Sequence, residues 1–243
     1  MKIFIKGNLE SDRNKENDNE ISKCETCRLL RPIIALVKII RRKILYAKWD
    51  PAKVTIDGKL DYEGGYFGML LQRTGKERHH IPGNTAIGIA FAFTSQNEDG
   101  SKQSGTTGFF SGLEMLKEDH DETANHAGKA NAENEEESYQ NRQVKFMQKG
   151  ELMKAVEMDV DDILRIQRKI PGNNPKRYNK GLFKAVYHIY HLLVMTDDEL
   201  KGQKDLLNGD KDAKLFEKAR NNKENIEQGK EILWQLYDRI IFC

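Results

Sequence analysis

All six histidines of the chain occur in three pairs, and the pair that most favours chemistry is His79/His80. Imidazole titrates near neutral pH, so it can act as a general base, and its neutral form binds divalent metal ions. Neighbours on an extended segment point to opposite faces, so His79 and His80 can serve one site only where the backbone bends, and Pro82 is placed to bend it. Lys76 and Arg78 add positive charge just before the pair. The alternative is two surface histidines in a polar turn.

The second pair, His120 and His126, lies beside the carboxylate of Asp119. On a helix that begins near Asp119, His120 and Thr123 share a face, whereas His126 lies about 240° round the helix axis from His120. Asp119 either caps this helix or offers an oxygen to a cation. Imidazole and carboxylate together suit zinc, nickel or manganese, with an open position for water or phosphate. Thr123 and His126 are further candidates for such a site.

The remaining motifs have structural explanations beside the chemical ones. His188 and His191 lie in an apolar helical pattern that favours core. The aspartates in residues 158–163 (Met-Asp-Val-Asp-Asp-Ile) form a helix cap or a bend between helices, or else bind a metal ion. Cys24 and Cys27 have zinc-like spacing, but no second Cys or His pair lies near them in the sequence. No phosphate-cradling glycine loop, nucleophile elbow or dinucleotide fingerprint is present.

The segments around these residues predict an α+β fold that is mainly α-helical, with a small β-hairpin and strand region. The predicted helices cover residues 32–49, start near residues 119, 135, 151 and after 175, and cover 197–207 and 222–242. The predicted strands are a hairpin over 54–62 around Asp57-Gly58, a strand over 68–73 and an apolar strand over 86–93. Residues 6–26 are expected to form a loose arm and residues 95–108 a surface loop.

Length and composition limit the class of protein. The 243 residues allow one large domain with appended segments, and we expect an N-terminal arm with a basic amphipathic helix (1–50), a central domain (51–195) and a C-terminal helical extension (196–243). A net charge of +2 excludes neither a nucleic-acid partner nor an acidic inhibitor. No apolar run reaches the roughly 18 residues of a transmembrane segment. The start lacks the pattern of a signal peptide, so any export is expected to use another route.

Residues 78–82, Arg-His-His-Ile-Pro, resemble the opening motif of a group of bacterial toxin domains found at the ends of polymorphic and contact-dependent toxins. In that group a strand ending in hydrophobic-x-Met precedes Asp-His-x-x-Thr, and residues 113–115 and 119–123 match this order. The resemblance covers roughly residues 75–193. Its further matches are the Tyr-x-x-Arg-Gln pattern at 139–143, Gly150, the Met-Asp motif at 158–163 and Arg177-Tyr178.

These toxin domains are similar to HNH and ββα-metal nucleases, so the resemblance implies a ββα-metal-like site in the strand region. His79 would bind a divalent ion (zinc, magnesium, manganese or nickel), with Asp119 and His120 as further ligands. His80 would be the general base that activates water, and Arg78 and Lys76 would contact the nucleic acid. The resemblance thus implies a metal-dependent nuclease that hydrolyses DNA or RNA. It implies an antibacterial toxin, exported by a specialised secretion system, active in the target-cell cytoplasm and blocked by a cognate immunity protein.

Two other functions compete with this hypothesis. A metal-independent ribonuclease would use His79, His80 and His120 as acid and base, because the RNA 2′-hydroxyl can be the nucleophile. A non-enzymatic helical module would bind nucleic acid, a membrane or a partner protein through the basic face of residues 28–48. That segment carries seven Lys or Arg between Cys27 and Trp49 and no acidic residue, although a solvated helix face explains the same pattern.

Overall fold

The computed structural model describes scattered positions between residues 32 and 40, and residues 44–56, 60–90, 111–125, 138–169, 176–202 and 217–242. The chain divides into two units, residues 1–49 and 50–243, and each is described by itself. Several predictions lie outside the described residues: the loose arm over 6–26, the Cys24/Cys27 pair, the loop over 95–108 and His126. Within the described part, no helix is long and apolar enough to cross a bilayer.

In the first unit, the described positions between Pro32 and Lys48 are helical, as the apolar periodicity predicts. The apolar side chains of that stripe are about half exposed: Ile33, Leu36, Val37, Ile40 and Ile44. The stripe therefore contributes little buried apolar area.

The second unit is a mainly α-helical α+β fold with one small antiparallel sheet, as predicted. Its strands are β1 (Gly64–Tyr66), β2 (Lys76–Ile81) and β3 (Ser111–Leu116), and short 3-10 helices cover η1 (Pro51–Lys53) and η2 (Phe67–Met69). Its helices are α3 (Asn84–Ala90), α4 (Lys117–Asp121), α5 (Tyr139–Gln148), α6 (Leu152–Lys169), α7 (Asn179–Val194), α8 (Asp197–Gly202) and α10 (Lys223–Phe242).

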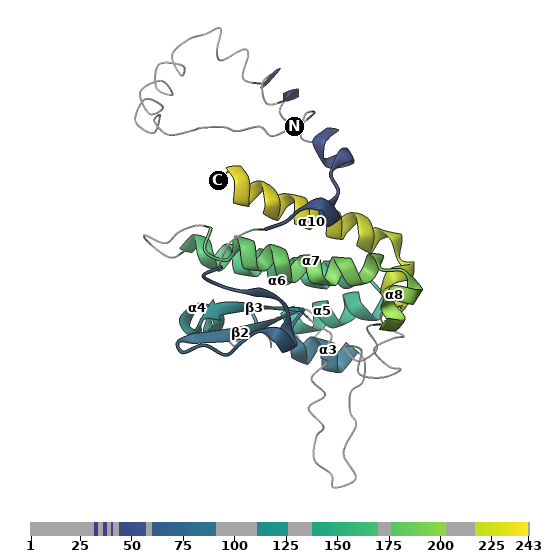
Figure 1. Ribbon diagram of the computed structural model, residues 1–243. Helices are drawn as coiled ribbons and strands as arrows, with labels where there is room; N and C mark the ends of the chain where they lie inside the picture. Colours follow the sequence, from purple (N-terminus) through teal and green to yellow (C-terminus); the bar gives the residue numbers. More distant parts are fainter. Residues whose placement is uncertain are drawn as a thin grey trace, which may run out of the picture. The chain divides into compact units, whose positions relative to one another are not determined.

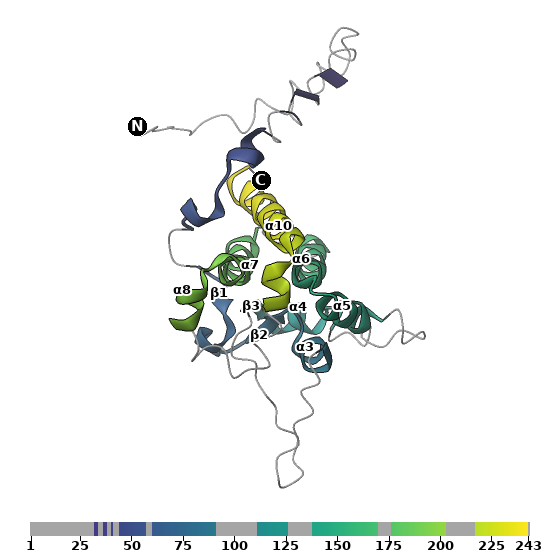
Figure 2. The same cartoon turned by 90° about the vertical axis from the view of Figure 1, so that its right-hand side faces the viewer.

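The helices stack in layers on the sheet, whose strand order is β1-β3-β2 (Figures 1 and 2). Helix α7 packs on β1 and β3, and α10 packs on α7 and α6. Helix α5 packs between α6 and α3. The described part of the predicted C-terminal extension therefore belongs to the same unit as the sheet. The centre of this core consists of side chains from all these layers: Leu113, Met115, Met153, Val156, Ile163, Leu182, Phe183, Val186 and Leu233.

Most of the apolar stripe of α7 around His188 and His191 is buried in the core, as predicted, but its last residue is not. Phe183 and Val186 are buried, whereas Val194 at the end of α7 is 42% exposed. The ring of His188 lies 5.6 Å from the ring of Tyr66, between centroids. This pair belongs to the packing of α7.

Three strand predictions are wrong. Residues 86–90 of the predicted strand over 86–93 belong to helix α3, because Ala86 and Ile87 bury their side chains in the contact of this helix with α5. A short apolar run fits a buried helix as well as a strand, and only tertiary contact decides between them. The predicted hairpin over 54–62 has no strand in its described residues, and Gly64–Tyr66 pairs with β3 instead. The predicted strand over 68–73 contains η2 and an irregular segment with Met69 and Leu71 exposed.

The close approach of α7 to the strand layer depends on Gly181. A Cβ atom added at this position would lie 2.8 Å from Leu113 Cδ1 and would also run into the carbonyl oxygen of Tyr62. Gly64 of β1 faces Gly181 in the same contact, so neither the strand nor the helix has a side chain there. The pair of glycines lets the helix lie directly on the sheet.

We therefore expect Gly181→Ala to destabilise the protein by about 1–3 kcal/mol, the usual cost of overpacking. Alanine is the better helix former by about 1 kcal/mol, so the expected sign is opposite to that of helix propensity. The measurement is the urea midpoint, with Lys184→Ala on the same helix as the control. A Gly181→Ala protein as stable as the parent would contradict the close packing of α7 on the sheet.

Candidate active site

β2 is an edge strand of the described sheet, because the order β1-β3-β2 pairs it with β3 alone. In this antiparallel register His79 lies opposite Leu113, and His80 lies opposite Gly112. Opposite residues share a face of the sheet, and neighbours along a strand point to opposite faces. His79 and His80 therefore point to different faces, as predicted, and the edge position lets both side chains reach the space beside the strand.

Each of these imidazoles packs against another ring. His79 is only 2% exposed, and its ring lies edge-on to the ring of His120, with centroids 5.5 Å apart. His80 stacks on Phe67 with the ring centroids 3.6 Å apart and the planes within 18° of each other. Phe67 belongs to η2, which directly follows β1. The two neighbouring histidines are thus oriented by different elements.

His120 reaches His79 because the chain passes directly from β3 into α4. β3 ends at Leu116, which lies opposite Lys76 at the start of β2, and α4 begins at the next residue. Helix α4 packs against both strands, so it lies beside β2. Two histidines about forty positions apart in the sequence therefore meet.

A cavity of about 320 Å³ opens where these side chains meet. Four of the predicted site residues line it: Arg78, His79, His80 and His120. The rest of its lining is polar or small and was not predicted: Gly83, Asn84, Thr85, Asn125 and Gln140. Among the residues that the structure describes, no lining side chain is a carboxylate, so this part of the lining suits an anion better than a cation.

The missed residues had a weak signal in the sequence. Asn84 and Thr85 are small polar residues immediately after Ile81-Pro82-Gly83, where β2 ends and α3 begins. Asn125 follows the Asp-His-x-x-Thr motif by two residues. Gln140 lies in the first turn of α5, and nothing in its sequence context points to the cavity.

Arg78 is held in place at the cavity wall. Its Nη1 donates a hydrogen bond of 3.2 Å to the carbonyl oxygen of Leu70, and its guanidinium lies 4.8 Å from the centroid of the Phe67 ring. Since a guanidinium carries five N–H donors, this hydrogen bond leaves most of them for other partners. Arg78 can thus contact an anion in the cavity.

Lys76 does not line this cavity. Its ammonium lies 3.4 Å from Glu114 Oε2 and 4.3 Å above the ring of Tyr62, and it also donates to the carbonyl oxygen of Asp61. Glu114 is buried and pairs with Arg73 as well, at 2.6 Å. The charge of Lys76 is therefore placed at the other end of β2 from His80.

Asp119 also lies away from the cavity lining. Its carboxylate is buried, and Oδ2 accepts a hydrogen bond of 2.5 Å from the Tyr178 hydroxyl and one of 3.5 Å from Arg177. Burial raises the pKa of Tyr178, with the hydrogen bond to Asp119 as the next cause, so this hydroxyl stays a donor. Asp119 therefore fixes α4 to the residues that precede α7.

Of the predicted metal set, His79 and His120 line the cavity together, whereas the carboxylate of Asp119 accepts a hydrogen bond from Tyr178. Among the residues that the structure describes, no group of three or more His, Cys, Asp or Glu side chains could hold a metal ion. His79 and His120 offer two imidazoles, whereas a catalytic zinc site uses about three protein ligands. The described lining of the cavity offers imidazole, amide and guanidinium groups, and the bound metal ion stays a prediction.

Thr123 has a structural role beside the site. Its hydroxyl donates to the carbonyl oxygen of His120 at 2.8 Å, and its backbone N–H donates to the same oxygen at 3.1 Å. Thr123 is fully buried and does not line the cavity. It closes the end of α4 just after His120.

The Met-Asp motif lies in the middle of α6, so the predicted cap or bend between helices is wrong. Asp162 Oδ2 accepts a hydrogen bond of 2.6 Å from the backbone N–H of Ala124. Asp159 Oδ1 accepts from the Tyr139 hydroxyl at 2.7 Å and from Asn125 Nδ2 at 3.4 Å. Since Asn125 lines the cavity, these two aspartates hold part of the cavity wall from behind.

Burial raises the pKa of Asp159 from its ordinary value of 3.8 to about 7. Hydrogen bonds from Tyr139 and Gln143 act in the opposite direction and are outweighed. The carboxyl group of Asp159 is therefore largely protonated in the folded protein below neutral pH, whereas in the unfolded chain it is ionised above about pH 4.

Comparison of the chain with protein-family models, curated protein sequences and solved structures finds no significant match.

We expect the stability of the protein to depend on pH through Asp159. Because its pKa is raised on folding, its favourable contribution is complete below about pH 4 and is lost as the pH rises to about 7. Asp159→Asn keeps an oxygen that accepts from Tyr139 but removes the ionisation. In urea unfolding at a series of pH values, this variant should lose much of the decline in stability between about pH 4 and 7.

Asp161→Asn is the matched control, because Asp161 lies on the same helix but is exposed. It should keep the pH dependence of the parent protein. If both variants follow the parent curve, the buried carboxyl group of Asp159 does not control this pH dependence.

Proposed function

We propose that this protein is a nuclease and that the cavity beside β2 binds the phosphodiester that is cut. The observation that supports this proposal is the convergence of Arg78, His80 and His120 on one cavity of about 320 Å³, whose described lining residues include no carboxylate. A phosphodiester is an anion, and its cleavage needs a proton acceptor, a proton donor and a group that stabilises charge on the phosphate.

The proposed role of each side chain follows from how exposed it is and from which neighbouring ring orients it. His80 and His120 are half-buried, so a substrate can touch them, whereas His79 is almost completely buried. His80, oriented by Phe67, accepts a proton from the attacking oxygen, and His120 donates one to the leaving oxygen. His79 is a positioning residue, because its ring packs on that of His120. Arg78 binds the phosphate oxygens, since a guanidinium can do so with two parallel hydrogen bonds.

We propose RNA as the substrate. In RNA the neighbouring 2′-hydroxyl can attack the phosphate, so two imidazoles are sufficient for the proton transfers. The position of Asp119 supports this route, because its carboxylate is bonded to Tyr178 and does not line the cavity. The metal-dependent route implied by the toxin resemblance would need ligands beyond His79 and His120.

We further propose that the nuclease acts as an antibacterial toxin with a cognate immunity protein. This part of the proposal is supported only by the resemblance of residues 75–193 to toxin domains. An acidic inhibitor that covers Arg78 would complement the charge of the cavity wall. Export by a specialised secretion system belongs to the same proposal.

We expect His80→Gln and His120→Gln each to lower the rate of RNA cleavage by about 10²–10⁴-fold, the usual contribution of a general acid or base. The assay measures cleavage of a fluorescently labelled RNA by gel electrophoresis, and circular dichroism checks folding. His191→Gln is the control, because His191 is an exposed histidine of α7 that does not line the cavity. Equal rates for His80→Gln, His120→Gln and the parent would remove the cavity from consideration as the active site.

We expect RNA cleavage to continue in excess EDTA and plasmid DNA to stay intact, because DNA lacks the 2′-hydroxyl. The same reactions with added magnesium, manganese or zinc complete the comparison. Cleavage that stops in EDTA and returns with one of these ions would overturn the metal-independent route and favour the metal-dependent one.

A further inference from the structure

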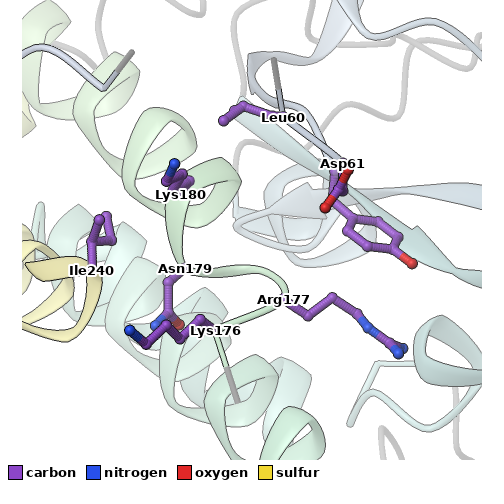
Figure 3. Close-up of a pocket in the computed structure, with 8 residues that line it drawn as sticks. Leu60, Asp61, Lys176, Arg177, Asn179, Lys180 and Ile240 are labelled. Atoms are coloured by element: carbon purple, nitrogen blue, oxygen red, sulfur yellow. The ribbon is translucent and has the colours of Figure 1, made fainter. Parts of the chain in front are cut away.

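A second cavity, of about 210 Å³, lies where the chain enters α7. Figure 3 shows Lys176, Asn179 and Lys180 around the start of this helix, with Ile240 of α10 on one side and Asp61 across from them. Arg177 and Tyr62 complete its polar wall. None of these residues contributes to the histidine cavity.

The charge of this second cavity is positive. Three of its lining residues are basic (Lys176, Arg177 and Lys180), and one, Asp61, is acidic. Both lysines are exposed, so their ammonium groups can move toward a bound anion. The ion pair of Arg177 with Asp119 is 3.5 Å long and uses one of the five N–H donors of the guanidinium.

Tyr62 extends this positive region toward β2. Its ring has the ammonium of Lys76 4.3 Å from its centroid and the guanidinium of Arg177 5.8 Å from it. Lys76 was predicted as a nucleic-acid contact, and the structure locates it next to this second cavity. Lys76 therefore lies beside the second cavity, through the ring of Tyr62, and Lys176, Arg177 and Lys180 line it.

The histidine cavity is lined by residues of β2, and Lys76 at the start of this strand lies over the ring of Tyr62, which lines the second cavity. Lys76 begins β2, and His79 lies three residues further along it. At a rise of about 3.4 Å per residue, this separation is about 10 Å. Even in a stacked duplex strand the rise per nucleotide is only about 3.4 Å, so a ligand that reaches from Lys76 to His79 spans more than one nucleotide. One mononucleotide cannot contact both cavities, whereas an oligonucleotide can.

We propose that the cavity lined by Lys176, Arg177 and Lys180 binds a backbone phosphate of the RNA a few nucleotides away from the bond that is cut. This inference rests on the proposed nuclease function and deepens it, because it assigns an extended single-stranded RNA as the substrate. A contact to a phosphate away from the reacting bond adds affinity and fixes the position of the strand without reading its bases.

The test uses the full chain and a 2′-O-methyl RNA of about a dozen nucleotides, which lacks the attacking hydroxyl and is not cut. Fluorescence anisotropy measures its dissociation constant at several salt concentrations. We expect Lys176→Gln/Lys180→Gln to weaken binding about tenfold at low salt. It should also lower the slope of log affinity against log salt by about one unit, because each lost phosphate contact lowers that slope by roughly 0.7–0.9.

The control is Lys149→Gln/Lys223→Gln, which changes the net charge equally. Both control lysines are exposed, and Lys223 is separated from Ile240 by about 25 Å of α10. This variant should keep the parent's salt slope. Equal weakening by both double variants, or an unchanged slope in Lys176→Gln/Lys180→Gln, would overturn the phosphate subsite.

Cleavage of a dinucleotide separates this inference from the proposed function. A dinucleotide contains only the phosphate that is cut and has none for the second cavity, so Lys176→Gln/Lys180→Gln should cut it at the parent's rate while it cuts the long RNA less efficiently at low concentration. A large loss of dinucleotide cleavage would show that these lysines act on the reaction itself and would contradict a remote subsite. If the parent cuts no RNA but the salt slope still falls, the phosphate subsite stands and the nuclease proposal fails.

Discussion

The antiparallel pairing of β2 with β3 is the constraint on which both cavities depend. It places His79 opposite Leu113, which packs beneath α7, and so holds one face of β2 against the core. The other face carries Arg78 and His80 toward Phe67. A slip of one residue in this register would exchange the faces of the two histidines. The core therefore selects which imidazole is buried beside His120 and which one a substrate can touch.

Buried carboxylates connect this strand pair to the helices. A carboxylate removed from water is costly unless hydrogen bonds replace the lost hydration. The hydroxyl of Tyr178 provides one for Asp119, and the hydroxyl of Tyr139 provides one for Asp159. The first contact ties α4 to the start of α7, and the second ties the cavity residue Asn125 to α5 and α6. Both motifs that suggested metal chemistry in the sequence therefore also orient the walls of the cavity.

The arrangement of charge separates two kinds of anion contact. The histidine cavity contains groups that can transfer protons, and among its described lining residues Arg78 alone carries a permanent positive charge. The cavity at the start of α7 contains lysines and an arginine, which bind an anion but are poor proton donors at neutral pH. β2 spans the distance between them. The two proposals thus assign proton transfer to the histidine cavity and binding of a backbone phosphate to the cavity at the start of α7.

Elements with a local signal could be predicted from the sequence. Helices α6, α7 and α10 follow from apolar periodicity, and the opposite orientation of His79 and His80 follows from the geometry of any extended segment. Features that depend on partners far away in the chain are visible only once it is folded. The pairing of β1 with β3 joins residues almost fifty positions apart in the chain. The apolar run after Pro82 forms helix α3, which packs against α5. The carboxylate of Asp119 accepts a hydrogen bond from Tyr178 instead of lining the histidine cavity. Periodicity within one segment carries no information about such contacts, because each is formed by residues that the sequence alone does not bring together.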